Sequence, residues 1–305
     1  MEKILLTGGA GYKGVKVAKK MLDEGYHVTI LDNFMYGFDA ILHLMDYKKI
    51  DVIKHDIRNP IDKISQYDII FHLAGISGYP ACESNPNSAQ LINVEATKQL
   101  VTSLSKSQLL IYASTTSFYG KSGNICDENI IIKPINMYGI TKYKAEQLIM
   151  ERENSVSLRF ATVFGPSPKM RMDLMVNDFT YKAIKEKCLV LFDSYAKRTF
   201  IHIDDASNSY LFTLKNIDAM RGNIFNIGGD HLNYSKLEIA QLINNKVDFK
   251  IIDSDIKDKD VRHFIISYKK IKNIGFIPQK TIENGIDELI KIFKFYDYFS
   301  FFKVI

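Results

Sequence analysis

The sequence predicts an α/β protein built on a doubly wound parallel sheet, with a smaller C-terminal lobe. Three observations lead to this prediction. Short β-branched runs alternate with segments of helical period through the first half of the chain, as in a parallel sheet covered by helices on both faces. A glycine-rich turn joins the first run to the first helical segment. After Gly165-Pro166-Ser167-Pro168 the alternation loosens, which marks the start of the lobe.

The elements of the first half are assigned in order from their periodicity. In the first helical segment, one face carries apolar residues at helical spacing, namely Val15, Ala18, Met21 and Leu22. Strands are expected at residues 3–7, 27–31, 51–54, 68–73, 109–113 and 156–160. Helices are expected at residues 12–24, 89–105 and 137–151.

The second half predicts a more mixed set of elements. Helices are expected at residues 173–186, 236–244 and 282–295, and strands at 189–192, 200–203 and 223–227. We therefore divide the chain into a first domain, 1–165, and a lobe formed mainly by 166–305, with segments near 198–228 returning to the first domain. The aromatic tail, residues 295–305, is expected to pack on the body of the protein or on a partner subunit.

Composition and charge exclude several classes of protein. The 305 residues are 46% hydrophobic and 25% charged, which is ordinary for a globular protein and excludes a disordered chain. Lys and Arg outnumber Asp and Glu by 40 to 35, but both signs alternate along the chain, so we expect no nucleic-acid partner; a basic pocket for an anionic small molecule stays open. The three cysteines form no C-x-x-C pair and fit a reducing compartment. With no signal or membrane-spanning segment, we expect a cytoplasmic protein without a membrane partner.

The glycine-rich turn has the spacing of a dinucleotide site. Gly8, Gly11 and Gly14 lie between a strand and a helix, where a tight turn brings the backbone against a diphosphate at the helix N-terminus. Asp32 ends the next strand, where a carboxylate accepts the adenosine ribose hydroxyls and repels a 2′-phosphate. The alternative is that Asp32 is a turn residue before Asn33. The pattern predicts NAD as the cofactor, in preference to NADP.

A tyrosine and a lysine suggest acid–base chemistry. Tyr138 and Lys142 are four residues apart and hence share one helix face. A nearby ammonium favours the phenolate form of tyrosine, which can then take a proton from a substrate hydroxyl. The same spacing recurs at three other tyrosines, Tyr12, Tyr181 and Tyr268. Tyr138 is selected because its helix follows the strand that ends in Ala113-Ser114-Thr115.

Taken together, these motifs resemble the extended short-chain dehydrogenase/reductase family, the NAD-dependent nucleotide-sugar epimerases and dehydratases, over nearly the whole chain. The matching segments are residues 7–14, 32–34, 55–58, 72–75, 93–94, 114–120, 138–142, 158–160, 165–166, 198–204, 225–228 and 275–278. Segments 79–82 and 167–177 are most similar to bacterial surface-sugar enzymes acting at C4. The resemblance implies a Rossmann-type NAD-binding domain at 1–165, a substrate-binding lobe and a homodimer.

The resemblance also implies roles for individual residues. It assigns a catalytic set to Thr115, Tyr138 and Lys142. It assigns cofactor contacts to Gly8, Gly11, Tyr12, Lys13, Gly14, Asp32, Asn33, Asp56, Ile57, Leu73, Ala74, Gly75, Asn93, Tyr138 and Lys142. Substrate contacts fall to Thr115, Thr116, Asn177, Arg198 and Arg262, with the two arginines at the diphosphate; a surface role for Arg262 stays open. Dimer contacts are expected from helices 89–105 and 137–151 through Leu91, Val94 and Leu100.

Two positions depart from the family pattern. Lys13 stands where the family usually has Ile or Phe, and either adds a phosphate contact or points into solvent. Thr116 and Ser117 replace the Asp-Glu pair with which the family's 4,6-dehydratases expel water, and hydroxyls of ordinary pKa cannot take over that role. Dehydratase activity is therefore disfavoured.

The remaining residues suggest no catalytic metal. The histidines form no H-x-H or H-E-x-x-H motif, His72 and His202 are expected to be packing residues, and Asp204-Asp205 is expected to cap a helix. The sequence thus predicts oxidoreduction at C4 of a nucleoside-diphosphate sugar, with 4-epimerisation as the main reading. The alternatives are a net C4 dehydrogenase or 4-keto reductase of the GDP-heptose type, and, more remotely, a non-catalytic dinucleotide-binding regulator.

Overall fold

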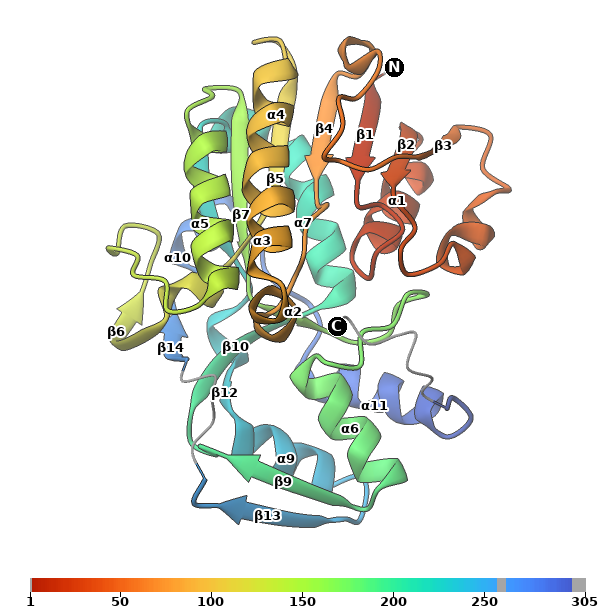
Figure 1. Ribbon diagram of the computed structural model, residues 1–305. Coiled ribbons are helices and arrows are strands. Elements are labelled where there is room, and N and C mark those ends of the chain that lie inside the picture. The colour runs from red at the N-terminus through yellow and green to blue at the C-terminus, as the bar shows by residue number, and fades with distance from the viewer. Residues whose placement is uncertain (1, 257–261, 298–305) are drawn as a thin grey trace.

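The core of the fold is a seven-stranded parallel sheet, seen in the upper part of the computed structural model in Figure 1. The structure describes residues 2–256 and 262–297. The strand order is β11-β7-β5-β4-β1-β2-β3, so the direction of winding reverses between β1 and β4. The predicted α/β class with a doubly wound parallel sheet is confirmed. The strands are β1 (Lys3–Thr7), β2 (His27–Asp32), β3 (Ile50–Lys54), β4 (Ile69–His72), β5 (Leu109–Thr115), β7 (Ser155–Phe160) and β11 (Asn223–Ile227).

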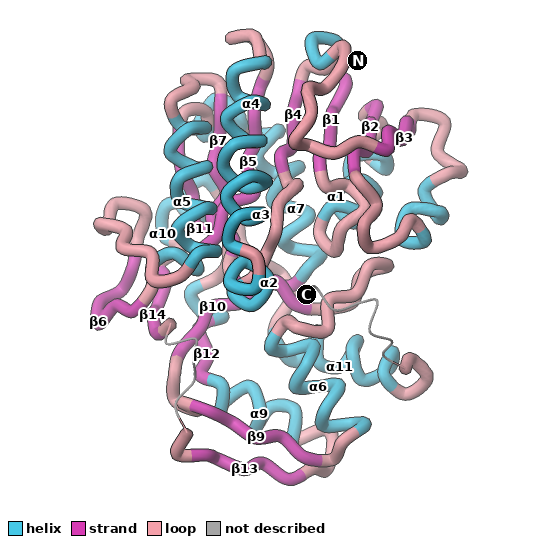
Figure 2. Tube along the Cα trace, viewed as in Figure 1, coloured by secondary structure: helices cyan, strands magenta, loops and turns pink. Residues whose placement is uncertain are grey.

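Helices cover both faces of this sheet (Figure 2). Successive residues of β1 show why: Ile4 and Leu6 belong to one buried cluster, and Leu5 belongs to another. The first cluster includes apolar residues of α1 (Gly14–Asp23) and α7 (Ile203–Lys215), and the second includes those of α4 (Ala96–Ser103) and α5 (Met137–Met150). This alternation is the period of two that a strand buried on both faces must have.

The helix predicted at residues 89–105 is interrupted. Its N-terminal part is α3 (Pro86–Gln90), followed by a π-helical turn over Leu91–Glu95 and then by α4. A π turn accommodates one extra residue and is often found at functional sites. The prediction that Leu91, Val94 and Leu100 together offer an apolar contact face is wrong in part. Leu91 is exposed, but Val94 and Leu100 are buried within the chain.

The lobe forms below the carboxyl ends of the strands and has its own core. Phe164, Val176, Phe200 and Ile286 are among its buried residues. Its helices are α6 (Met175–Lys185), α9 (Lys236–Asn244) and α11 (Ile282–Phe293). A three-stranded sheet of β12 (Asn233–Ser235), β10 (Lys197–His202) and β8 (Thr162–Phe164) joins it to the large sheet, and β9 (Cys188–Phe192) pairs with β13 (Lys250–Ser254).

Shorter elements complete the fold. Strands β6 (Lys121–Cys126) and β14 (His263–Ile266) form a pair, and the small helices are α2 (Tyr79–Ser84), α8 (Ile217–Met220) and α10 (Lys269–Ile274). Short 3₁₀-helical segments lie at Asp39–Leu44, Ile64–Gln66, Thr116–Tyr119 and Asp230–Leu232. Residues 298–305 of the aromatic tail lie outside the described part, while Tyr296 packs on Phe293 with ring centroids 6.3 Å apart. No described helix combines the length and apolar character needed to cross a membrane.

Candidate functional site

A cavity of about 680 Å³ opens where the strands of the large sheet end and the lobe begins. The carboxyl ends of β1, β2 and β5 contribute Gly8, Asp32 and Thr115, and the lobe contributes Arg198 and Arg262. In a doubly wound sheet, ligands bind in the crevice where the winding reverses, and this cavity lies there. Its volume is in the range of small-molecule and cofactor sites.

Two glycines of the turn at the start of α1 are packed too tightly for any side chain. Gly8 has a φ of +71°, and a Cβ there would lie 2.6 Å from the backbone nitrogen of Ala74. A Cβ on Gly14 would lie 2.2 Å from the carbonyl oxygen of Gly8. The turn therefore presents bare backbone and the N-terminal end of α1 to the cavity, which is a setting that suits a phosphate.

Asp32 is fixed at the rim of the cavity by two backbone amides. Its Oδ2 accepts a hydrogen bond from Ala10 (3.1 Å), and its Oδ1 accepts one from Phe34 (2.9 Å). Burial raises the pKa of Asp32 above its ordinary value, and these two bonds oppose the rise. The carboxylate is thus oriented before any ligand arrives. Asn33 lines the same rim.

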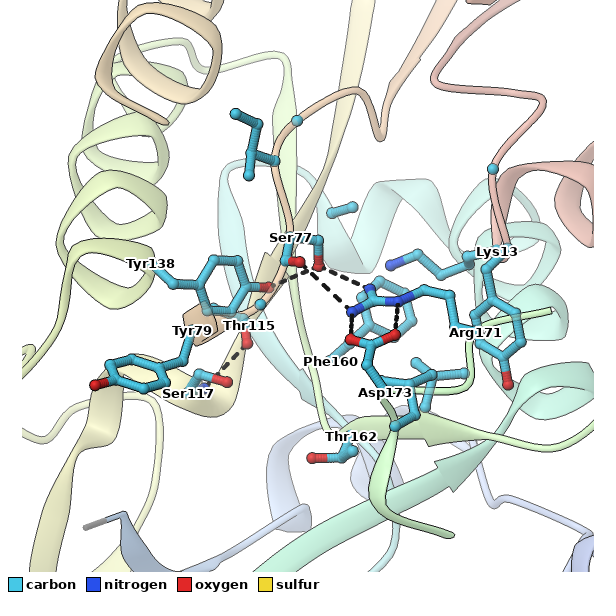
Figure 3. A pocket seen from close by; sticks show the side chains of 18 of the residues that line it. Lys13, Ser77, Tyr79, Thr115, Ser117, Tyr138, Phe160, Thr162, Arg171 and Asp173 are labelled. Atoms are coloured by element: carbon cyan, nitrogen blue, oxygen red, sulfur yellow. Dashed lines mark hydrogen bonds and ion pairs between the residues drawn. The ribbon is translucent and has the colours of Figure 1, made fainter. Parts of the chain in front are cut away.

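Tyr138 and Thr115 point into the same part of the cavity, as Figure 3 shows. The Tyr138 hydroxyl lies 3.5 Å from Ser77 Oγ, its hydrogen-bond donor. Thr115 Oγ1 accepts a hydrogen bond from the backbone nitrogen of Ser117 (3.0 Å), which fixes its rotamer. Asn136 caps α5 by accepting a bond from Gly139 (2.8 Å), and so sets the first turn on which Tyr138 lies.

Lys142 lies one turn further along α5, and it is buried. Burial lowers the pKa of Lys142 to about 7, because the nearby carboxylate of Glu146 offsets only part of the cost. Its Nζ is 4.0 Å from the centroid of the Tyr112 ring. One turn later again, Glu146 forms a buried ion pair with Arg159 of β7 at 2.7 Å, which ties the helix to the sheet.

Residues 165–171, here called the strap, connect the lobe to the three loops that follow β1, β2 and β4. Tyr12 Oη donates to the Gly165 carbonyl (2.6 Å), and Ser167 Oγ donates to the Tyr12 carbonyl (2.7 Å). Lys169 Nζ donates to the Tyr36 carbonyl, beyond β2. Arg171 donates to Ser77 Oγ at 3.2 Å, beyond β4, and pairs with Asp173 (Figure 3). The strap therefore crosses the cavity from the glycine turn to the neighbourhood of Tyr138.

The described lining of the cavity is strongly basic. Among residues 2–256 and 262–297, three acidic side chains line it, namely Asp32, Asp173 and Asp178. Against these stand the basic side chains of Lys13, Lys142, Lys169, Arg171, Lys182, Arg198, Lys236 and Arg262. Such an excess of one sign focuses the field and favours an anionic ligand. Arg262 also donates to Ser117 Oγ (2.6 Å), which places it inside the cavity and not on the outer surface.

The residues present fit a bound dinucleotide. Besides the bare glycine turn and the oriented Asp32 carboxylate, Ser114 offers a buried hydroxyl oxygen that has no hydrogen-bond partner among the described residues. Ser114 lines the cavity beside Thr115. A buried polar atom without a partner costs free energy, and a ligand that bonds to it removes that cost.

Most of the residues singled out from the sequence line this cavity, and four do not. Asp56 pairs with Arg58, and Thr116 Oγ1 donates to the Phe160 carbonyl (3.2 Å). Asn93 lies behind the wall, where its amide donates to the Ile76 carbonyl (3.0 Å) and its Oδ1 accepts from the Ile76 nitrogen (2.8 Å). Asn177 is buried beneath the strap, accepting from the Gly165 nitrogen (3.0 Å) and donating to the Arg171 carbonyl (2.9 Å).

Sequence reasoning missed several residues of the cavity. Ser77, Ser114, Phe160, Lys169 and Arg171 all line it. Lys169 and Arg171 lie in a segment that the resemblance already covered, and their positive charges in a stretch rich in methionine were the available signal. Ser77 carried none, because its partner Tyr138 lies 61 residues away.

A second group of charged residues lies outside the cavity. His202, Asp204 and Glu288 have ligand-type atoms within 4.8 Å of one another. Ion pairs account for them: Lys16 pairs with Asp204 (2.8 Å) and Lys280 with Glu288 (2.8 Å).

The prediction that Asp204-Asp205 caps a helix is wrong. His202 is the N-cap of α7 and accepts a hydrogen bond from the Asp204 nitrogen (3.2 Å), and both aspartates lie in the first turn. His72 is a packing residue between Thr7 and Thr97, and burial lowers its pKa to about 3.

Comparisons with known proteins point in one direction. The sequence profile described as "NAD dependent epimerase/dehydratase family" matches residues 4–228. CDP-paratose 2-epimerase of Salmonella typhi is 28% identical over 94% of this chain and 98% of its own length. The putative UDP-glucose 4-epimerase of Methanocaldococcus jannaschii is 25% identical over 95% and 98% of the two chains. UDP-glucuronic acid 4-epimerase from Bacillus cereus, solved with UDP-glucuronic acid and NAD, superposes with a TM-score of 0.83 over 96% and 99% of the two chains at 24% identity.

Proposed function

The chain belongs to the NAD-dependent epimerase/dehydratase family, and on that premise we propose that it is an NAD-dependent nucleotide-sugar 4-epimerase. The prediction that it is an enzyme with NAD as cofactor is confirmed by its family and its relatives. One observation carries the narrower proposal. The Tyr138 hydroxyl and Thr115 lie in the same basic cavity as the glycine turn and the oriented Asp32, so one ligand site adjoins the other.

In this proposal the chain's own residues handle the proton of the substrate. Thr115 bonds the C4 oxygen of the sugar, and Tyr138 takes the proton of the C4 hydroxyl as that carbon is oxidised. The Lys142 ammonium, one turn away, stabilises the phenolate of Tyr138. NAD, which the glycine turn and Asp32 would hold, would supply a reversible hydride acceptor for C4. Once the 4-keto sugar presents its opposite face, Tyr138 would give the proton back to the C4 oxygen, which completes the epimerisation.

The basic side chains support a nucleoside-diphosphate sugar as substrate. Arg198 and Arg262 line the cavity, and their guanidinium groups are suited to a diphosphate. We assign the cofactor to the first domain, 1–165, with the glycine turn at its diphosphate and Asp32 at its adenosine ribose. The lobe, 166–305, then holds the nucleotide of the substrate. This division brings the sugar to the boundary between the two, where Tyr138 lies.

We also propose a homodimer in the cytoplasm. Closed two-fold pairing is the commonest oligomeric arrangement, and Leu91, 49% exposed on the π turn, leaves an apolar contact open there. None of the three cysteines takes part in a disulfide, which fits a reducing compartment. Analytical ultracentrifugation at micromolar concentration should give a dimer. A single species of 35.0 kDa would contradict it.

The decisive experiment uses a panel of nucleotide sugars that differ in base and sugar. Each is incubated with the purified protein and NAD, the sugar is followed by NMR, and the reduced cofactor by its absorbance. Inversion at C4 without net accumulation of NADH is expected for one member of the panel. Stoichiometric NADH together with a stable 4-keto sugar would replace the epimerase by the dehydrogenase of the GDP-heptose type. Absence of both from every sugar, in a protein that binds NAD, would refute the proposal.

A further inference from the structure

Lys13 is a cation within the cavity for which the described part of the chain supplies no counter-ion. Its side chain leaves the glycine turn toward the Phe160 side of the cavity, as Figure 3 shows, and does not point into solvent. The Nζ atom lies 3.5 Å from the centroid of the Phe160 ring and 5.8 Å from that of Tyr210. These ring faces are its partners, since no hydrogen bond or ion pair to Nζ occurs among the described residues.

The neighbours of Lys13 increase the free-energy cost of its positive charge. Burial in the cavity lowers the pKa of Lys13 well below its ordinary value, and the positive charges of Lys142 and Arg171 lower it further. Asp173 already balances Arg171, at a distance of 3.0 Å between Nε and Oδ1. Negative charge brought by a ligand opposes this lowering of the pKa and favours the ammonium form of Lys13.

The two forms of the cofactor present different charges to this ammonium. Both carry the same diphosphate, so any contact of Lys13 with the phosphates is equal in the two. They differ at the nicotinamide, which carries a positive charge when oxidised and none when reduced. Lys13 extends from the glycine turn, suited to the diphosphate, into the cavity that also holds Tyr138 and Thr115, where the hydride is transferred in the proposed function. Its charge thus opposes the oxidised ring and not the reduced one.

We propose that Lys13 is a redox-tuning residue, whose ammonium stabilises the reduced form of the bound cofactor relative to the oxidised form. The proposal rests on the proposed function for the place of the reacting ring. Hydride transfer from the sugar carries two electrons to the nicotinamide and removes its positive charge, while the hydroxyl proton passes to Tyr138. A cation beside the ring favours that direction. The enzyme consequently holds more of its substrate as the 4-keto sugar than a relative that has Ile or Phe at this position would.

The expected effect follows from one unit of charge in a partly buried site. For two unit charges several ångströms apart at an effective dielectric constant of about 20 to 40, Coulomb repulsion changes the preference between the two forms by on the order of tenfold. A phosphate contact alone would change the affinity for both forms and leave their ratio unaltered. The ratio of the two dissociation constants is therefore the quantity to measure.

The test compares the wild-type protein with Lys13→Met, Lys13→Gln and Lys13→Arg. NADH is titrated by its fluorescence, and NAD⁺ by displacement of NADH. We expect the ratio of the NAD⁺ to the NADH dissociation constant to fall about tenfold in Lys13→Met and Lys13→Gln, and to stay near the wild-type value in Lys13→Arg. Equal weakening of both forms, or an unchanged ratio, in a neutral variant that still binds them would overturn the proposal. Failure of the wild-type protein to bind either form would instead remove the proposed function, and this inference with it.

Discussion

Replacing Lys142 by methionine should stabilise the cofactor-free protein while removing its activity. Burial lowers the pKa of Lys142 from 10.5 to about 7. At about 1.4 kcal/mol for each pKa unit, a protonated Lys142 costs the folded state up to about 5 kcal/mol relative to the unfolded chain. Methionine has a similar length and no charge, so the variant avoids this cost. It also lacks the ammonium that supports the phenolate of Tyr138.

The contribution of Lys142 to the stability of the protein depends on pH, and the direction of its pKa shift determines how. The folded pKa of Lys142 lies below the unfolded one, so the unfolded chain binds the extra proton between about pH 7 and pH 10.5. Stability of the wild-type protein therefore rises with pH through that window, as far as Lys142 is concerned. The penalty from Lys142 is about 4 to 5 kcal/mol near pH 6.5 and about 1.4 kcal/mol near pH 9.5. The gain in free energy of unfolding from Lys142→Met should therefore shrink by about 3 kcal/mol between pH 6.5 and pH 9.5.

Urea unfolding of both proteins at these two pH values measures the advantage. All other titrating groups are shared, so the difference between the two proteins isolates Lys142. Lys144→Met is the matched control, because Lys144 is an exposed residue of the same helix and its replacement should change the free energy of unfolding by about 0.5 kcal/mol or less. If Lys142→Met is no more stable than wild type near pH 6.5, or if its advantage is the same at both pH values, the argument from burial is wrong.

Three further changes probe the catalytic base, the cofactor preference and the support of the site. Tyr138→Phe should lower turnover by about 10²–10⁴-fold while NAD still binds, and Tyr181→Phe should stay within a few-fold of wild type in the same kinetic assay. Asp32→Ala should weaken NAD binding by about tenfold or more in calorimetric titrations and reduce the preference for NAD over NADP, because the carboxylate that faces the ribose is lost. Glu146→Ala should lower the free energy of unfolding by about 3–5 kcal/mol in urea, because it leaves Arg159 buried without its partner.

Each of these three predictions has an outcome that would contradict it. Near-normal turnover of Tyr138→Phe on the sugar that wild type accepts would mean that the base is another group. Equal or tighter binding of NADP by the wild-type protein would remove the argument from Asp32. For the ion pair, the double variant Glu146→Leu with Arg159→Met should recover part of the lost stability, since two apolar residues leave no buried charge. A double variant less stable than Glu146→Ala would show that the pair stabilises the fold by itself.

The sequence was sufficient for those elements whose cause is local. The strand at Lys3–Thr7 and the α1 helix follow from an apolar run and a helical period that a short window of the chain displays. The glycine turn was also predictable, since a close approach of backbone leaves few alternatives to glycine at Gly8 and Gly14. The interruption of the helix at residues 91–95 was not, because a π turn has the composition of an ordinary helix.

The site could be predicted only where its parts follow each other in the chain. Tyr138 and Lys142 share one helix, and their relation is visible in the spacing. The strap is different: Gly165 and Tyr12 are 153 residues apart, and Arg171 and Ser77 are 94 apart. Their contacts depend on how the lobe docks on the sheet, which no local pattern encodes. Asn177 illustrates the result, since it was assigned to the substrate and instead holds the two ends of the strap.

The strap also has a consequence for how the lobe can move. Ser167, Lys169 and Arg171 bond to the loops that follow β1, β2 and β4, so three separate loops hold one short segment of the lobe. A rotation of the lobe away from the sheet would have to break these bonds together. Opening of the cavity at the glycine turn is therefore coupled to its opening near Tyr138.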